Sequence, residues 1–455
     1  MQTRGLTALF STVAVGVATL ICGAAPAAAV PLHVQYPAHF AQPPTTAECE
    51  TQYQIACYGP QQFQQAYDMT PLYRAGLTGA GETIVIVDAY GSPTIQSDLQ
   101  TFDQAYGLPA PPSFKIIQPA GPVPPFDPTA NPDQPGWGVE TSLDVEYSHT
   151  MAPGANILLV ETPTDETEGT AGFPQIVEAE NYVIDHHLGD VISQSFGATE
   201  ETFPSPQSIY ALRSAYKNAA AHDVTVLAGS GDEGVTNDEL SEVDFYPYRV
   251  NSWPSSDPLV TSVGGTQLHL DASGYRTAPD NVWNDPFSVC GGPCAGGGGL
   301  SAVFSRPSYQ DGIANIVGGA RGTPDISLSA AVNGAANVYW SFQGAGTPGW
   351  APIGGTSEAT PEFSGIVAIA DQAAGHPLGL LNPTLYSLGD QWQSGIVDIT
   401  RGNNTVTFTN SNGVTYTVQG YDATRGYDLA SGLGTVDGAR LVGELARFRH
   451  GGRNH

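Results

Sequence analysis

The feature that most restricts the fold of this chain is a regular alternation of apolar runs with helical segments, which begins at Gly81. Four runs are largely apolar and short enough for strands: residues 83–90 (TIVIVDAY), 156–161 (NILLVE), 190–197 (DVISQSFG) and 224–231 (VTVLAGSG). Further strands are expected at 114–119 and 258–265, and helices at 93–106, 137–151, 174–187 and 206–222. Apolar strands separated by helices are typical of a parallel sheet covered on both faces. We therefore expect one large α/β domain with a mostly parallel central sheet flanked by helices.

The ends of the chain differ in composition from this domain. Arg4, an apolar run over residues 6–22 and the pattern Ala27-x-Ala29 predict a signal peptide at residues 1–29. Residues 30–70 are rich in Pro and Gln, and we expect them to be irregular or extended and too few for an independent domain. The main domain then spans residues 71–445, and a polar tail covers 446–455. These features predict a secreted, extracellular protein.

The charge of the chain limits its partners. It has 44 acidic and 15 basic residues, a formal net charge of -29. A surface this acidic repels nucleic acids and anionic membranes, so we expect neither as a partner. After the signal peptide no segment is long and apolar enough for a membrane span. An acidic, lysine-poor composition suits a protein that works at low pH, and we expect a monomer.

The four cysteines that follow the signal peptide lie in two local pairs. Cys49 and Cys57 form one pair, and Cys290 and Cys294 form the other. In an exported protein an even number of cysteines favours disulfides. Three pairings are formally possible, and the two short loops are favoured. A zinc site is the alternative, although the pairs lie in unlike contexts and no histidine flanks them.

A glycine-rich turn places Ser357 at the start of an expected helix. In GGTSEATPEFSG (354–365) the serine follows small residues, and the apolar residues after it give the helix a buried face. Such a turn presents a hydroxyl as a nucleophile, which then needs a base. None of the ten histidines lies in a sequence context that suggests this role. A carboxylate base is therefore considered.

Two acids in the helix expected at 137–151 are candidates for this base. Glu140 and Asp144 are four residues apart, so their carboxyls lie on one face of the helix. In a partly buried site the two would share a proton, which raises one pKa and lowers the other. Glu140 would then accept the proton of Ser357 while Asp144 orients Glu140. The alternative is an ordinary solvated acidic face.

A third acid ends an expected strand. Asp232 lies in GSGDEG (229–234), at the carboxyl end of the strand, the edge where open α/β sheets bind ligands. A protonated Asp232 can donate a hydrogen bond to a developing oxyanion. The alternative is a turn residue that bonds its own backbone. Asp88 also ends a strand, and we interpret it as structural or at most in contact with substrate.

Several motifs occur together in the order of one family. They are ETSLDVE (140–146), MAPGA (151–155), SQSFG (193–197), GSGDEG (229–234), GGGGLSAVFSRPSYQ (296–310), GTPDIS (322–327), GGTSEATPEFSG (354–365) and GYDLASGLG (426–434). On these motifs the chain resembles the sedolisins, secreted serine-carboxyl peptidases with a subtilisin-like three-layer fold. The resemblance implies Ser357 as nucleophile, Glu140 as base, Asp144 as its partner, and Asp232 with the Ser357 N–H as oxyanion hole. It also implies that Ser195, Phe196 and Gly197 pair with the backbone of an extended substrate.

The resemblance further implies one bound calcium ion near the C-terminus. The matching positions are Asp398, Ile399, Thr424, Gly426 and Asp428. Two carboxylates and backbone carbonyls are the hard oxygen ligands that Ca²⁺ prefers. The alternative is a polar turn cluster, and a second GYD at 420–422 makes Asp422 a rival for Asp428.

The match departs from the family at three places. Residues 30–70 are too few for the large pro-domain that the family carries, which leaves self-processing open. Thr424 replaces a usual glycine. Glu358 follows the serine where a small residue is usual. It either complements the helix dipole as an acid in the first turn, the favoured interpretation, or acts as a further carboxyl of the site.

These observations lead to one functional hypothesis with two alternatives. We expect a serine endopeptidase that cleaves polypeptides at acidic pH through an acyl-enzyme, because Glu140 must be ionised and Asp232 protonated at the same time. The alternatives are a tripeptidyl exopeptidase of the same fold, and a catalytically inactive binding or surface module.

Overall fold

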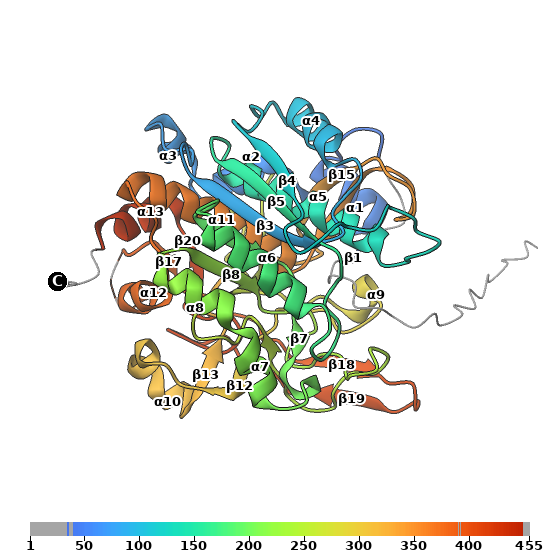
Figure 1. Cartoon of the computed structure of the whole chain (residues 1–455), viewed down its shortest axis with the longest axis vertical. Helices are drawn as coiled ribbons and strands as arrows, with labels where there is room; N and C mark the ends of the chain where they lie inside the picture. Colours follow the sequence, from blue (N-terminus) through green and yellow to red (C-terminus); the bar gives the residue numbers. More distant parts are fainter. Residues whose placement is uncertain (1–33, 36–39, 390, 392, 449–455) are drawn as a thin grey trace, which may run out of the picture.

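The computed structural model describes residues 34–35, 40–389, 391 and 393–448, and has an eight-stranded sheet at its centre (Figure 1). Seven strands follow one another in the order β11-β10-β8-β6-β3-β5-β4, and β14 pairs with β10. The strands are β3 (Thr83–Ala89), β4 (Phe114–Ile117), β5 (Asn156–Thr162), β6 (Val191–Gln194), β8 (Thr225–Gly229), β10 (Thr261–Gln267), β11 (Asn281–Val282) and β14 (Ile326–Ser329). All of these pairs are parallel except β10 with β11. The predicted parallel sheet is confirmed.

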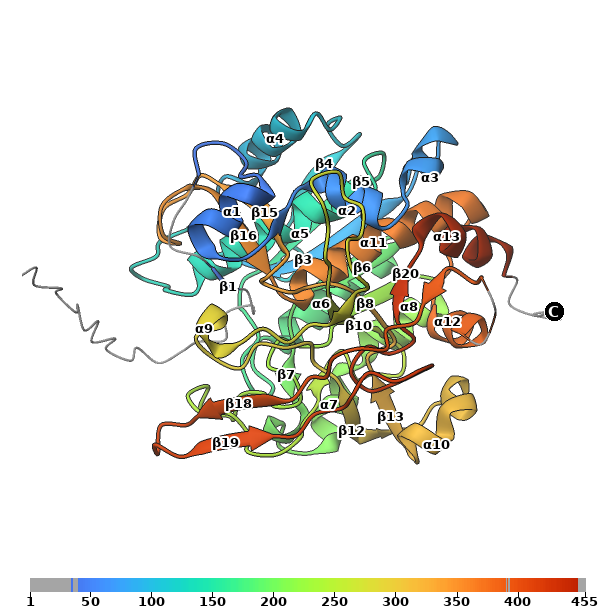
Figure 2. The same ribbon diagram turned by 180° about the vertical axis from the view of Figure 1, so that it is seen from behind.

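Alternate side chains of the central strands enter two separate cores, as the pleat of a strand requires. Ile84 and Ile86 of β3 pack in the core that contains helices α5 (Gln134–Met151) and α11 (Thr356–Ala374). Val85 and Val87 pack in the core that contains α6 (Phe173–Asp185) and α8 (Ser214–Ala221). The core with α11 also receives α4 (Ile95–Tyr106) and α13 (Gly438–Arg447). The sheet is thus covered on both faces, as predicted (Figures 1 and 2).

Two predicted elements differ in the structure. The helix expected at 206–222 is two helices, α7 (Pro206–Leu212) and α8, because the chain leaves the helical conformation at Arg213. The Nε of Arg213 lies 2.5 Å from Asp257, which holds this residue against a neighbouring loop. The strand expected at 190–197 ends at Gln194, so Ser195–Gly197 lie beyond β6.

The N-terminal segment is better ordered than expected. Its described part contains α1 (Thr46–Tyr53), β2 (Cys57–Tyr58), α2 (Pro60–Ala66) and the first residue of α3 (Thr70–Arg74). The strand β2 pairs with β15 (Ala335–Trp340), and β1 (Val34–Gln35) pairs with β16 (Gly349–Gly354). Phe63, Tyr67 and Met69 are fully buried. The prediction of an irregular segment was wrong for residues 40–70, because their apolar side chains complete the core. The predicted signal peptide lies outside the described residues.

The remaining elements lie mainly in the C-terminal half (Figure 2). The strands β18 (Val406–Thr409) and β19 (Thr415–Val418) form an antiparallel hairpin around Asn412-Gly413. The other elements are β7 (Ala198–Thr199), η1 (Glu200–Thr202), β9 (Ser252–Trp253), α9 (Phe287–Cys290), β12 (Gly299–Ser305), η2 (Ser308–Ile313), α10 (Ala314–Val317), β13 (Ala320–Thr323), α12 (Asn382–Gly389), β17 (Ile396–Val397) and β20 (Thr435–Val436). Both predicted disulfides, Cys49–Cys57 and Cys290–Cys294, are present, so these thiols cannot hold zinc.

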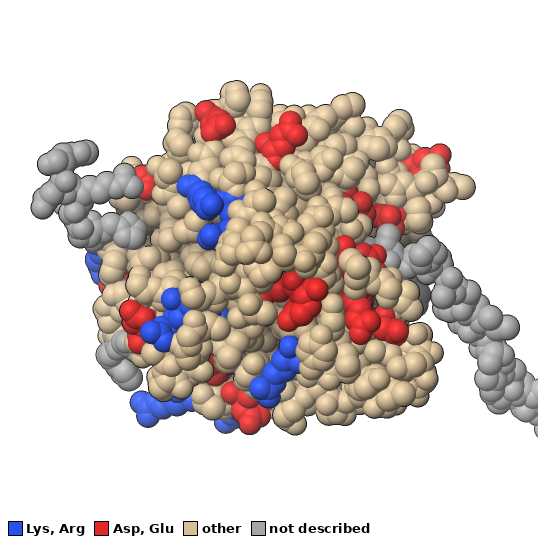
Figure 3. All heavy atoms as spheres, turned by 60° about the horizontal axis from the view of Figure 1, so that its bottom comes forward, with Lys and Arg blue, Asp and Glu red and all other residues tan. Residues whose placement is uncertain are grey.

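The surface is less acidic than the composition suggests. Figure 3 shows one face on which acidic and basic side chains are scattered among uncharged residues. Many acidic side chains, including Glu140, Glu180 and Asp371, are fully buried. The excess of acids over bases therefore lies partly in the interior. Among the described helices, none is both long and apolar enough to cross a bilayer.

Candidate active site

The predicted nucleophile and acids come from three elements that meet at one end of the sheet. Glu140 and Asp144 lie on α5, Asp232 follows β8, and Ser357 is the second residue of α11. Helices α5 and α11 pack closely, since a Cβ on Gly365 would lie 2.6 Å from the Cβ of Met151. Ser357 is 4 % exposed, and Glu140 and Asp144 are fully buried.

A tight glycine turn places Ser357 on α11. Gly355 has φ 140°, a conformation that residues with a Cβ rarely adopt. Its N–H donates to the carbonyl of Ala330 at 2.7 Å, and a Cβ on Gly354 would lie 2.9 Å from the same oxygen. The two glycines therefore let the chain pass close to the end of β14 and begin the helix at Thr356. This local geometry agrees with the turn expected from GGTS.

The carboxyl of Asp232 is joined to the start of this helix. Its Oδ1 accepts hydrogen bonds from the N–H of Thr356 at 2.7 Å and from the Thr356 hydroxyl at 2.8 Å. Burial raises the pKa of Asp232 to about 8, although the two Thr356 bonds lower it, and the nearby Glu140 raises it further. Asp232 is therefore neutral in acid and adjacent to Ser357. It bonds α11 rather than only its own turn.

A cluster of acids surrounds Glu140. Burial raises the pKa of Asp144 well above its usual value, and both Asp88 and Glu140 raise it further. Burial likewise raises the pKa of Asp88, and Glu140 adds to the shift. Glu140 thus interacts with Asp88, Asp144 and Asp232. Asp88 belongs to this cluster, and the sequence analysis did not predict its membership. Its position at the carboxyl end of β3, the same sheet edge as Asp232, was the available signal.

The side chain of Ser195 makes a contact that the sequence did not predict. Its hydroxyl donates to Oδ1 of Asp144 at 2.9 Å, so its side chain supports the acid cluster. Ser195, Phe196 and Gly197 lie between β6 and β7 and belong to neither strand. Ser195 and Phe196 are buried, and Gly197 is half-buried. The edge strand expected from SFG is therefore a connecting segment.

The polar contacts of the described histidines lie elsewhere in the fold. His149 is fully buried, with Nε2 2.7 Å from the carbonyl of Pro109 and 3.3 Å from Asp103. His186 and His222 contact carbonyls of their own helices, and His269 contacts Asn281. These contacts agree with a site that relies on carboxyls.

Glu358 is not a solvated acid at a helix terminus. It lies in the first turn of α11 but is fully buried. Burial raises its pKa well above the usual value of 4.5. Glu358 is therefore a first-turn acid, as favoured from the sequence, but its burial disfavours the charge with which it would complement the helix dipole.

The residues assigned to calcium surround one turn. Asp398 accepts a hydrogen bond from the N–H of Gly426 at 3.1 Å, and Asp428 accepts one from the N–H of Thr424 at 2.8 Å. Asp422 instead pairs with Asn403 in an isolated antiparallel β-bridge, and Asp422 is exposed. Two carboxylates and the carbonyls of one turn are the hard oxygen ligands that Ca²⁺ prefers, while Oδ1 of Asp428 also accepts from the N–H groups of Ala430 and Ser431.

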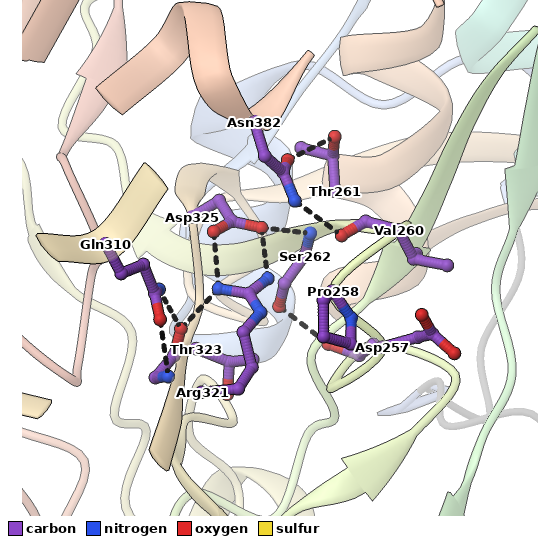
Figure 4. A network of polar contacts seen from close by, with 12 residues as sticks. Asp257, Pro258, Val260, Thr261, Ser262, Gln310, Arg321, Thr323, Asp325 and Asn382 are labelled. Carbon is purple, nitrogen blue, oxygen red and sulfur yellow. Dashed lines mark hydrogen bonds and ion pairs between the residues drawn. The ribbon is translucent and has the colours of Figure 1, made fainter. Parts of the chain in front are cut away.

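A buried ion pair anchors the GTPDIS motif (Figure 4). Arg321 and Asp325, both fully buried, form two bonds of 2.5 and 2.6 Å. Asp325 also accepts from the N–H of Ser262 in β10 at 2.8 Å. The N–H of Ser327 donates to the carbonyl of Gly434 at 2.9 Å. The motif therefore ties the central sheet to the C-terminal segment rather than supplying a reacting group.

Comparison with known proteins gives a consistent relationship. Residues 129–385 match the Subtilase family. Kumamolisin of Bacillus sp. (strain MN-32) is 34 % identical over 85 % of this chain, and sedolisin of Pseudomonas sp. (strain 101) is 31 % identical over 88 %. The dog tripeptidyl-peptidase 1 (Canis lupus familiaris) is 30 % identical over 68 %. The chain spans 63 %, 62 % and 52 % of the lengths of these three relatives.

A solved structure extends the likeness to three dimensions. Pseudomonas sedolisin complexed with two molecules of pseudo-iodotyrostatin superposes with a TM-score of 0.69 at 29 % identity, over 86 % of this chain and 98 % of that one. The expected subtilisin-like fold is confirmed. The chain therefore belongs to the subtilase family and, within it, to the sedolisins, the serine-carboxyl peptidases.

Proposed function

We propose that this protein is a secreted serine endopeptidase that cleaves polypeptides at acidic pH. The observation that carries the proposal is the pair of hydrogen bonds between Asp232 and Thr356, which hold a neutral carboxyl beside Ser357. The interaction of Glu140 with Asp232 supports a role for Glu140 in the same site. The export-type N-terminus supports secretion.

The reaction would use these groups in sequence. Glu140 accepts the proton of Ser357 as its Oγ attacks the scissile carbonyl. The oxyanion that forms accepts hydrogen bonds from the protonated Asp232 and from the N–H of Ser357. Glu140 then gives its proton to the leaving amine, and the acyl-enzyme remains. Water, activated by Glu140, hydrolyses this ester and restores Ser357.

The remaining acids would orient the base. Asp144 lies one turn from Glu140 on α5, and Ser195 holds one of its oxygens. Asp88 interacts with both acids of α5. Buried carboxyls this close to one another do not all ionise at once, so the cluster shares its charge. This sharing favours acidic pH, at which Asp232 is fully protonated.

We also propose that one calcium ion stabilises the C-terminal segment. Asp398 and Asp428 would supply carboxylate oxygens, and Ile399, Thr424 and Gly426 would supply backbone carbonyls. When bound, the ion would neutralise the two carboxylates. It would be structural, because these residues lie outside the acid cluster around Glu140.

The decisive experiment digests a denatured protein and a defined peptide at pH 4 with the full chain and with Ser357→Ala. Internal fragments from the wild type alone support an endopeptidase. Release of successive tripeptides from a free amino terminus would instead support exopeptidase action, as the name of one relative suggests. The absence of cleavage products from both the wild type and Ser357→Ala would support a binding module.

A further inference from the structure

The helix that carries Ser357 also holds two buried acids that the proposed reaction does not use. Glu358 and Glu362 lie one turn apart on α11, and both are 0 % exposed. Like charges at this spacing repel even on an exposed helix. In the interior the repulsion is stronger, because the effective dielectric constant is lower than in water.

Glu358 faces polar groups from several elements. The Ser329 hydroxyl at the end of β14 and the Ala336 N–H in β15 both lower its pKa, against the larger effect of burial. Asp232 raises it further. The phenols of Tyr58 in β2 and Tyr147 in α5 also lie within electrostatic range of Glu358.

Glu362 lies one turn further along, under the N-terminal segment. Burial raises its pKa, Glu358 adds to the shift, and the hydroxyl of Tyr67 partly offsets it. That hydroxyl also accepts a hydrogen bond from the N–H of Ser329 at 2.7 Å, so Tyr67 bridges α11 and β14. Both Tyr67 and Tyr147 are within electrostatic range of Glu362.

No described cation compensates the pair. Arg276, whose guanidinium lies 5.8 Å from the ring centre of Tyr67, is bonded to Asp280 at 2.9 Å and does not shift the pKa of either glutamate. The other described elements that pack on α11, namely β3, β6, β8, β10, β16 and α13, contribute no charged side chain that shifts either pKa. A buried carboxylate without a counter-ion is costly, so the carboxyls are stable here only in the protonated state.

We propose that Glu358 and Glu362 are a protonated acid pair, buried where the first turns of α11 pack against β14, β15 and the tyrosines of the N-terminal segment, and that loss of their protons at rising pH opens this packing around Ser357. This pH-dependent opening rests on the proposed function only for its biological purpose. It would restrict an acid-active enzyme to acid surroundings.

The sign of the pH dependence follows from proton linkage. The folded pKa of each glutamate lies above its usual value of 4.5, so the folded state keeps protons that the opened state releases. Stability is therefore fully present below that value and falls as pH rises towards the folded pKa. If the closed state binds one proton more than the open state, the equilibrium constant for closing falls about tenfold for each unit by which the pH rises. If it binds two protons more, the constant falls about a hundredfold.

Hydrogen exchange of the full chain tests this directly. Measurements in a Ser357→Ala background avoid self-digestion and need no catalysis. We expect peptides that cover residues 57–67 and 353–365 to lose protection between pH 5 and pH 8, after correction for intrinsic exchange. The variant Glu358→Gln/Glu362→Gln, which mimics the protonated pair, should keep that protection.

A matched control separates this pair from buried acids in general. Glu180 on α6 is also fully buried, its pKa is raised to about 8, and it packs in the other core. Glu180→Gln should leave the pH-dependent loss at 57–67 and 353–365 as in the parent. The proposal is overturned if the parent keeps constant protection over this range, or if the double glutamine variant loses protection as the parent does. If the double variant does not fold, each single glutamine variant should show about half the slope on a logarithmic scale.

Discussion

Asp232 and Thr356 are joined by two hydrogen bonds, one from the N–H and one from the hydroxyl of the threonine, at 2.7 and 2.8 Å. Thr356 directly precedes Ser357, so the acid of the proposed oxyanion hole is fixed relative to the nucleophile. The same bonds cap the start of α11. The contacts that satisfy the first N–H of the helix therefore also fix the position of the acid.

Removing the threonine hydroxyl should disturb this arrangement without removing either catalytic group. For Thr356→Val we expect kcat to fall about fivefold, the effect of one hydrogen bond of about 1 kcal/mol. Because the Thr356 hydroxyl lowers the pKa of Asp232, its loss should move any alkaline limit set by Asp232 to higher pH. A pH–rate profile checks both effects.

The matched control for this change is Thr360→Val. Its hydroxyl donates to the carbonyl of Thr356 at 2.8 Å and is not bonded to Asp232. It should alter stability without moving the pH profile. A profile that shifts equally in both variants would contradict the role given to Thr356.

Glu140→Gln should remove the proposed base while preserving the shape of the side chain. We expect kcat/KM at pH 4 to fall about 10²–10⁴-fold, the usual contribution of a general base. Glu146→Gln is the control on the same helix, since Glu146 is also buried but accepts from the N–H of Tyr339 at 3.1 Å. Near-normal turnover of Glu140→Gln would rule out the carboxylate base.

Removal of calcium should lower the melting temperature of the protein. An ion at a hundred times its Kd stabilises the folded state by about 2.7 kcal/mol. Asp398→Asn should lose most of this response to chelator, whereas Asp422→Asn should keep it, because Asp422 is exposed and pairs with Asn403. Thermal unfolding with and without chelator measures the difference. An unchanged melting temperature in the wild type would exclude the site.

The ion pair between Arg321 and Asp325 should be strongly stabilising relative to its broken form. Arg321→Leu leaves a buried carboxylate without its partner, and we expect a loss of about 3–5 kcal/mol in the free energy of unfolding. Arg306, partly exposed and 3.0 Å from the exposed Asp311, is the control, and Arg306→Leu should cost about 1 kcal/mol or less. Urea unfolding at one pH compares the two. Equal losses would show that burial does not matter here.

Sequence reasoning succeeded where neighbours along the chain decide the outcome. The strands were recognisable because buried parallel strands are apolar throughout, and the turn before Ser357 because only glycine suits Gly355. The cysteine pairs were predictable because each joins residues that are close in sequence. The ends of the helices were predicted less accurately. The break between α7 and α8 at Arg213 is an example, because the contact of Arg213 with the distant Asp257 holds the chain there.

The tertiary structure alone decided which acids are buried together. The spacing of Glu140 and Asp144 placed these two on one face of α5, but nothing in their local sequence shows that Asp88 of β3 joins them. From the sequence, Glu358 was interpreted as an ordinary acid in the first turn of a helix. Helix periodicity does not reveal that β14, β15 and the N-terminal segment cover it. The sequence by itself determined the strands, the helices and the chemical groups available. Only packing determined their charge states, because the pKa of a carboxyl depends on its solvation and on the charges around it.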